Sequence, residues 1–377
     1  MISTADVVIC GAGIAGISAA YHLAVRHGIK NVVLVDDQPP LTVTSDKSTE
    51  CYRNWWPGPG DTMVRFMNRS IDLLEELAEE SGNRFAMNRN GYVYLTAEPE
   101  KAAELKALGR AISELGAGEL RVHDSTTGTA GGAYPETRFD TLDRGLGGAD
   151  FLTGSAAIHE RFPFVAEDAL ALLHPRRCGW LSAQQLGMYL LEKAREHGVR
   201  LLAGRLQEVI VEAGQVTGVR LAGVPETETI ATRCFVNAAG PFAPEVGRKS
   251  GVALPLFNEL HGKVTFDDYL GIVPRALPLL IWSDPVTLSW SDEERAELER
   301  DPELAWLLAP LPAGVHFRPE GGHGSRALLL LWTYHLEPVE PRFPPAFDPF
   351  YPEVVLRGLV RMVPGLAAYL RPNAIRR

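Results

Sequence analysis

The chain has 377 residues, of which 46% are hydrophobic and 22% charged, an ordinary globular composition that is long enough for two domains. Its 37 basic and 47 acidic residues give a net charge of −10, which opposes non-specific binding to nucleic acid or to an anionic membrane surface. No segment approaches the roughly 18 uninterrupted apolar residues of a membrane span. The four cysteines are scattered and no cluster of metal ligands stands out, so we expect a cytoplasmic protein without a metal site.

The first predicted element is a nucleotide-binding turn. An apolar strand over residues 7–10 runs into a Gly-x-Gly-x-x-Gly motif and then into a helical pattern that reaches residue 24. The first glycine suits the tight turn, the second lets the backbone approach a pyrophosphate, and the third lets the helix pack on the strand. The candidates for cofactor binding in this motif are Gly11, Ala12, Gly13, Ile14, Ala15 and Gly16.

An acidic residue follows at the expected distance. The second predicted strand, residues 31–35, ends in Asp36. Dinucleotide-binding proteins place a carboxylate there, about 20 residues after the turn, to bind the ribose hydroxyls. Asp37 is the alternative acid at this place. Strand, turn, helix and acid together predict a dinucleotide site.

The next stretch, residues 42–60, is rich in hydroxyl groups and then in aromatic rings. Its hydroxyls and Lys47 could wrap the phosphates and sugar hydroxyls of a cofactor, while Arg53, beside two tryptophans, could hold a carboxylate. The alternative interpretation is a solvated turn. The cofactor-binding candidates in this loop are Ser45, Lys47, Ser48 and Thr49.

Helices and short strands are expected along the rest of the chain. The patterns predict helices over residues 61–81, 98–115, 182–197, 244–250 and 353–362, and one that begins at the capping box Ser291-Asp-Glu-Glu. They predict strands over residues 91–96, 259–266, 277–282, 314–318 and 327–334, and a meander over 205–213, 216–221 and 227–236. Residues 123–155 show no periodicity and are expected to form a mobile loop or insertion.

The order of these pieces resembles the D-amino-acid oxidase superfamily of flavoproteins, which includes sarcosine oxidase, glycine oxidase and dimethylglycine dehydrogenase. Four stretches carry the resemblance, and the most specific is Phe-Val-Asn-Ala-Ala-Gly-Pro after a meander. The four stretches are residues 11–16 with Asp36, the loop 45–53, Gly-Trp-Leu at 179–181 with its helix, and 235–241 followed by 251–255. This resemblance moves the expected cofactor from NAD to FAD, bound without a covalent link.

The resemblance implies an α/β fold in which a Rossmann-like FAD-binding domain is joined to a second, mainly antiparallel α+β substrate domain. The implied boundaries are 1–90 and 155–255 for the first domain, 91–154 and 256–345 for the second, and 346–377 for a C-terminal helix that returns toward the first. Superfamily members continue after a Val-Pro-Gly-Leu helix, matched here by residues 363–366, with a further strand and a glycine-rich flavin loop. Residues 371–377 carry neither, so we expect an open flavin pocket and weak FAD retention.

The resemblance also assigns roles to residues. It implies Asp36 on the adenosine ribose, Ser48 and Thr49 near the pyrophosphate and flavin, and the backbone of Val209 near adenine. The small residues Ala239 and Gly240 are expected to let a ligand approach the backbone closely.

Catalytic candidates come from both domains. Arg53 resembles the arginine that holds the substrate carboxylate in sarcosine oxidases. Lys263 is predicted to share a strand face with His261 and, if that face looks at the flavin, to stabilise negative charge on it. Arg318 and Tyr334 are further candidates.

We therefore expect an FAD-dependent oxidoreductase that oxidises a small amine or amino acid of the sarcosine, glycine or D-amino-acid class by hydride transfer to flavin N5. One alternative is a 2-hydroxy acid or glycerol-phosphate dehydrogenase of the same fold, and another is an inactive, C-terminally incomplete FAD-fold protein. The expected partner is the small-molecule substrate, and an oligomer is possible.

Overall fold

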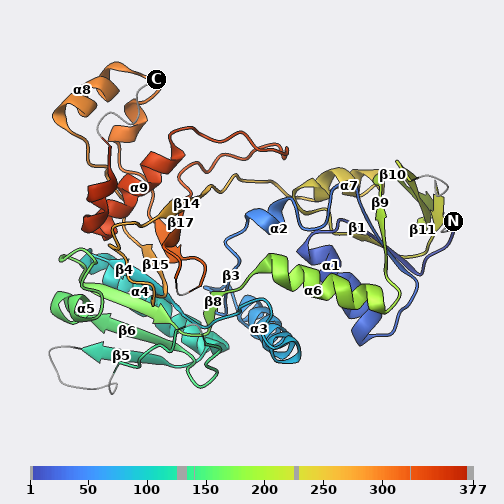
Figure 1. The fold of residues 1–377 in the computed structure, drawn as a ribbon, viewed down its shortest axis with the longest axis horizontal. Coiled ribbons are helices and arrows are strands. Elements are labelled where there is room, and N and C mark those ends of the chain that lie inside the picture. The colour runs from blue at the N-terminus through green and yellow to red at the C-terminus, as the bar shows by residue number, and fades with distance from the viewer. Residues whose placement is uncertain (1–2, 125–133, 140, 225–228, 323, 372–377) are drawn as a thin grey trace.

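The computed structural model describes residues 3–124, 134–139, 141–224, 229–322 and 324–371. Its two main sheets occupy opposite ends of an elongated molecule (Figure 1). Between them lie a short helix, α2 (Thr44–Lys47), and a two-stranded ladder of β3 (Cys51–Arg53) and β8 (Cys178–Trp180). The segment 44–53 therefore connects the two halves.

The N-terminal half is built on a parallel four-stranded sheet. In spatial order its strands are β13 (Phe235–Asn237), β1 (Val7–Cys10), β2 (Val32–Asp36) and β9 (Arg200–Ala203). Both faces of this sheet are covered, which is why β1 and β2 are continuous apolar runs. The predicted Rossmann-like arrangement is confirmed.

Different elements cover the two faces of this sheet. Ile9 shares a core with α1 (Ile14–Tyr21) and α6 (Ala183–Glu196), whose N-cap Ser182 accepts a hydrogen bond from the amide of Gln185 as predicted. Val8 packs with the antiparallel meander, which consists of β10 (Arg205–Glu212), β11 (Gln215–Ala222) and β12 (Thr229–Ala231).

The prediction of a single strand over 227–236 is wrong. The structure divides this stretch into β12 of the meander and β13, which pairs with β1. A local turn separates them, in which the amide of Cys234 donates to the Oγ1 of Thr232 (3.3 Å). The two strands differ in burial, since only Ile230 of β12 is buried and all three residues of β13 are partly buried.

The second half is built on a mixed eight-stranded sheet. In spatial order its strands are β14 (Lys263–Asp267), β17 (Ala327–Leu331), β16 (His316–Pro319), β15 (Leu279–Trp282), β4 (Tyr92–Thr96), β7 (Ala171–Pro175), β6 (Ala149–Thr153) and β5 (Leu120–Asp124). Only the neighbours β15/β4 and β5/β6 are parallel among these pairs. β6 contradicts the prediction that 123–155 is a loop, because its first four residues are all buried and show no polar alternation. The described residues of that stretch end in α5 (Ser155–Arg161), and residues 125–133 and 140 lie outside the description.

Helices cover one face of the large sheet completely and the other in part. Trp332 lies in a core with α5, α8 (Asp292–Arg300) and α9 (Tyr351–Met362). On the opposite face, Phe151 packs with α3 (Thr62–Ser81) and α4 (Pro99–Ile112). The capping box predicted at Ser291 begins α8, with both of its hydrogen bonds present.

Two implied domain boundaries differ from the structure. β7 lies within 155–255, the range expected for the nucleotide-binding domain, yet it pairs in the eight-stranded sheet. α9 does not return toward the first domain, because Val354 and Leu359 are buried in the core beneath Trp332. The short helix α7 (Ala243–Lys249) follows β13 as predicted. No helix of the described residues is long and apolar enough to cross a membrane.

The packing of α9 on the sheet gives a test of the fold. A Cβ at Gly358 would lie 2.3 Å from the Trp332 ring, so Gly358→Ala should lower the free energy of unfolding by about 1–3 kcal/mol. This loss should outweigh the better helix propensity of alanine. Urea unfolding measures it. The control is Gly147→Ala, where a Cβ meets no atom within 4 Å, and an equal change in both variants would contradict the packing.

Candidate cofactor and substrate site

The glycine turn is so tight that only glycine fits at two of its positions. Gly11 has a φ of 109°, and a Cβ there would lie 2.2 Å from the carbonyl oxygen of Ala238. A Cβ on Gly16 would lie 1.9 Å from the carbonyl oxygen of Gly11. The close packing brings the start of α1 to the wall of a cavity lined by Gly13, Ile14 and Ala15. The first amide groups of a helix lack intrahelical partners and favour an anion such as a pyrophosphate.

Asp36 occupies the position expected of a ribose-binding acid. One carboxylate oxygen accepts a hydrogen bond from the amide of Ala12 (2.6 Å) and the other from that of Gln38 (2.8 Å). The carboxylate is thereby fixed at the end of β2, on the wall of the same cavity. Asp37 also lines this cavity, where it lies 3.7 Å from the exposed Arg205.

The hydroxyl-rich loop is docked at three points. The Oγ of Ser45 accepts a hydrogen bond from the amide of Ile14 at the start of α1 (2.9 Å). From the other half, Lys263 donates to the carbonyl of Ser48 (2.8 Å). Arg318 donates to the carbonyl of the next residue, Thr49 (2.9 Å). These contacts hold the loop in place, while Thr44, Asp46 and Lys47 stay exposed to solvent.

Two cavities meet along this loop. The first, of about 760 Å³, extends from Asp36 past the glycine turn, and Ala239 and Gly240 form part of its wall. The second, of about 1200 Å³, continues beside Ser48 to a wall formed by the large sheet. They share residues that include Thr44, Ser48, Gly240, Pro241 and Phe242. Together they form a channel suited to an extended dinucleotide, with its phosphates at the glycine turn.

Other predicted cofactor residues take different places. Lys47 lines the larger cavity and forms an ion pair with Asp46. Val209 pairs with Val219 and is buried in the core under the meander, whereas Gly204 and Leu206 line the first cavity. The side chain of Val209 therefore does not line the cavity, and the expected contact of its backbone with adenine stays a prediction.

Tyr334 does not face the cavity. Its ring stacks on Tyr351 of α9, and its hydroxyl donates to Asp348 (3.3 Å). The preceding residue, Thr333, lines the larger cavity. Because successive side chains of an extended segment point to opposite faces, Tyr334 must lie on the helix-covered side. Trp55, one of the two tryptophans beside Arg53, is also buried in a core.

Lys263 and His261 both line the larger cavity but differ in environment. The strand begins only at Lys263, so the two side chains are not held on one regular strand face as predicted. His261 is 61% exposed and lies 3.2 Å from Glu259. Lys263 is instead half-buried and held against the loop.

The two candidate arginines lie behind the cavity wall. Arg318 is only 1% exposed, pairs with Glu320 (2.5 Å) and lies over the Trp180 ring, so its visible role is to anchor the loop. Arg53 lies over the ring of Trp56, 4.2 Å from its centroid, and donates to the hydroxyl of Tyr94 (3.0 Å).

The sequence analysis missed His316, which lines the larger cavity. It lies on β16 two residues before Arg318, so the period of two in a strand was the signal that could have found it. The buried thiol of Cys10, near Asp36, behaves as a small apolar group, because burial raises its pKa to about 12.

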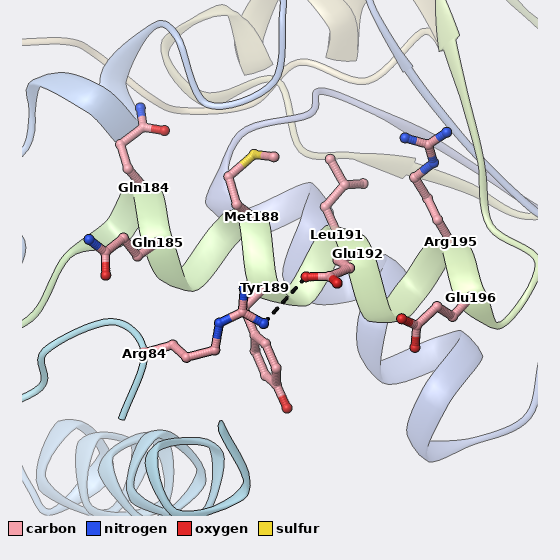
Figure 2. A pocket seen from close by; sticks show the side chains of 9 residues that line it. All are labelled: Arg84, Gln184, Gln185, Met188, Tyr189, Leu191, Glu192, Arg195 and Glu196. Carbon is pink, nitrogen blue, oxygen red and sulfur yellow. Dashed lines mark hydrogen bonds and ion pairs between the residues drawn. The ribbon is translucent and has the colours of Figure 1, made fainter. Parts of the chain in front are cut away.

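A separate pocket lies on the outer face of α6 (Figure 2). Arg84 lies 3.5 Å from Glu192 there and over the Tyr189 ring. Because its guanidinium is already paired, this pocket offers a ligand less than the channel does. The described residues contain no group of three or more metal-ligating side chains.

Comparison with known proteins agrees with the geometry. A family model described as "FAD dependent oxidoreductase" matches residues 6–266. Over 334 residues the chain is 28% identical to the mitochondrial dimethylglycine dehydrogenase of Rattus norvegicus, covering 88% of this chain and 32% of that protein. It is also 26% identical to the mitochondrial sarcosine dehydrogenase of Mus musculus. That match covers 72% of this chain and 26% of that protein. The chain thus spans about a third or less of the length of these relatives.

Solved structures share the fold. L-proline dehydrogenase from P. horikoshii superposes with a TM-score of 0.68 at 16% identity, covering 98% of this chain and 79% of that one. L-α-glycerophosphate oxidase from Mycoplasma pneumoniae superposes with a TM-score of 0.63 at 12% identity. The match covers 96% of this chain and 79% of that one.

Fold and site define a two-domain dinucleotide-binding protein. The family match covers more than half of the chain, and the chain belongs to the FAD-dependent oxidoreductases of the D-amino-acid oxidase superfamily. FAD is the cofactor of this family.

The position of Asp36 gives a test of the adenosine end. Asp36→Ala should weaken FAD binding by about 1–3 kcal/mol, because a hydrogen bond to a charged group is lost. Titration of the flavin-free protein with FAD measures this. Asp37→Ala is the matched control and should have a smaller effect, because that carboxylate already faces Arg205. Equal affinities for all three proteins would remove Asp36 from the site.

Proposed function

We propose that this protein oxidises a small amino acid or N-methylated amino acid, and that Arg53 binds the carboxylate of the substrate. When bound, FAD supplies the acceptor for the hydride that leaves the carbon next to nitrogen. The chain's own residues bind and orient the substrate. The relatives named for dimethylglycine and sarcosine support this class of substrate.

The unpaired charge of Arg53 is the observation that carries the proposal. Within the described residues, no carboxylate lies at ion-pair distance from its guanidinium, and its Nε is buried without a hydrogen-bond partner. Tyr94 and Trp56 fix the plane of the group. A partly buried cation without a counterion is unfavourable, and a carboxylate ligand would satisfy it in a bidentate manner.

Arg53 lies behind the wall of the larger cavity, and its charge acts on that wall. Its charge is one of the causes that lower the pKa of His316, which lines that cavity. The chain enters β3 directly from Ser48 and Thr49, two further residues of the cavity wall. A substrate held by Arg53 would therefore lie on the sheet side of the channel.

Lys263 supplies a second cation at this end of the channel. Its ammonium group is held by the carbonyl of Ser48, beside the place expected for the flavin. A fixed positive charge there would stabilise negative charge as it develops on a reduced cofactor. We propose that Lys263 contributes to the rate through this charge and that Arg318 acts only by positioning the loop.

A 2-hydroxy acid or glycerol phosphate is the second candidate substrate class. The glycerophosphate oxidase shares the fold, and Arg53 would bind a phosphate as readily as a carboxylate. Anaerobic mixing with each class and recording of the flavin absorbance distinguishes them. The lack of bleaching by either class would favour the non-catalytic alternative.

Cytoplasmic location, non-covalent FAD and oligomeric state stay predictions. Cell fractionation tests the location, acid precipitation tests the attachment of FAD, and light scattering tests the oligomeric state.

The role of Arg53 can be tested by substitution. Arg53→Lys should raise KM for N-methylglycine by about 10- to 100-fold, because a point charge cannot replace the guanidinium fork on a carboxylate. N-methylethylamine, which lacks a carboxylate, should be oxidised at nearly unchanged KM. Arg65→Lys, at an exposed and remote position, is the control. Equal losses for both amines would show that Arg53 is structural.

A further inference from the structure

His316 presents one nitrogen to the larger cavity in a defined protonation state. Its Nδ1 lies 2.7 Å from the carbonyl oxygen of Gly314. A carbonyl can only accept, so Nδ1 carries the proton and Nε2 keeps a free lone pair. Within the described residues, no hydrogen bond reaches Nε2. The cavity wall thus contains an acceptor that a ligand can use.

The strand register places His316 between the two cationic groups of the proposed site. Lys263 and His316 both pair with Leu331, from opposite sides, and His316 pairs with Ile281, which pairs with Tyr94. Residues paired in register share a face, and neighbouring strands lie about 4.8 Å apart. The backbone of His316 is therefore roughly 10 Å from that of Lys263 and from that of Tyr94, which holds Arg53.

The surroundings keep the His316 ring neutral. Burial lowers its pKa below the ordinary value of 6.5, and the charges of His261 and Arg53 add to this, against the opposing hydrogen bond to Gly314. Lys263 is a further cation on the same face, and the adjacent strands present the apolar Leu331 and Ile281. The carboxylates that face this group of cations are those of Glu259, which is paired with His261, and of Glu50 and Asp46, which interact electrostatically with Lys263.

We propose that Nε2 of His316 accepts a hydrogen bond from the nitrogen of the substrate and so selects primary and secondary amines over tertiary amines. This inference rests on the proposed function. With the carboxylate at Arg53, the nitrogen of an amino acid lies toward His316. A neutral primary or secondary amine has an N–H to donate and still has its own lone pair, whereas a neutral tertiary amine has no N–H.

The contact would also contribute to the rate. As the hydride leaves the adjacent carbon with its electron pair, the lone pair of nitrogen forms the C=N double bond and the nitrogen gains positive charge. Its N–H becomes a stronger donor, so the bond to Nε2 strengthens in the transition state. No bond to His316 breaks or forms covalently, and the proton stays on nitrogen. Protonation of His316 at low pH would abolish the acceptor and repel the developing cation.

Two variants distinguish the hydrogen bond at Nδ1 of His316 from the acceptor at Nε2. His316→Asn can keep a donor toward the Gly314 carbonyl but has no atom at the place of Nε2, whereas His316→Gln can place an amide oxygen there as acceptor. We expect His316→Asn to reduce the rate constant of anaerobic flavin reduction by N-methylglycine by about 10- to 100-fold. The rate with N,N-dimethylglycine should be slow in the native protein and change less than about threefold.

Restoration by His316→Gln should be substantial. Because the pKa of His316 is lowered from 6.5, we expect its protonation to reduce the rate of the native protein only at a pH below that value, and this part of the pH dependence should be absent from His316→Gln, whose amide does not titrate. Equal losses with both substrates in His316→Asn, or failure of His316→Gln to restore any rate while it still binds FAD, would overturn the assignment.

Binding of an amino acid that cannot be oxidised tests the contact with His316 independently of the proposed function. 2-Methylalanine has the carboxylate and amine but no hydrogen on the carbon between them, so it cannot be oxidised there. In 15N-histidine-labelled holoenzyme, adding it should shift the Nε2 resonance that is missing from His316→Asn. An unmoved resonance overturns the contact. Failure of every amine to bleach the flavin would instead refute amine oxidation.

Discussion

The docking of the segment 44–53 between the two sheets is the constraint on which the site depends. Ser45 ties it to the first turn of α1, while Lys263 and Arg318 hold the carbonyls of Ser48 and Thr49 from the large sheet. The ladder of β3 with β8 then fixes Arg53. Because charged donors to carbonyls are stronger than neutral ones, two of these three anchors resist displacement. The cofactor channel takes its shape from this segment.

The two faces of the large sheet have different roles: one packs in the hydrophobic core and the other lines the larger cavity. Leu330 and Trp332 point into the core beneath α9, whereas Leu331 and Thr333 line the cavity. The same division separates Tyr334, stacked on α9, from the proposed substrate side. Helices α3 and α4 pack on the part of the second face that β5, β6 and β7 form, together with Tyr94 of β4. The larger cavity lies over β14, β17 and β16, which contribute Lys263, Leu331 and His316 to its wall.

Features formed by residues close together in the sequence could be predicted from it. Features that depend on how distant strands pair could not. The glycine turn, Asp36 and the cap at Ser291 follow from residues a few positions apart, and the structure contains all three. The face that Tyr334 takes depends on where β17 ends, which nothing in the neighbouring residues specifies. The strand β6 escaped detection because it is buried on both faces, so the alternation that indicates a strand is absent.

Site residues show the same limit. Arg53 was noticed from its neighbours, but its contact with Tyr94, 41 positions away, is purely tertiary. His316 carries no local motif, and its importance comes from the register that sets it between Lys263 and Tyr94. Along β10, Leu206 lines the first cavity whereas Val209 does not, and a register shift between Leu206 and Glu208 interrupts the regular alternation there.

The central claim is that both cavities form one FAD site bridged by the segment 44–53. Thermal unfolding with saturating FAD or ADP tests it directly, because ADP can fill only the first cavity. At a thousandfold over its Kd, a ligand stabilises the folded state by about 4 kcal/mol. Compared at equal concentration, FAD should therefore raise Tm clearly more than ADP does. Identical shifts with the two ligands, or no shift with FAD, would contradict a site that spans both cavities.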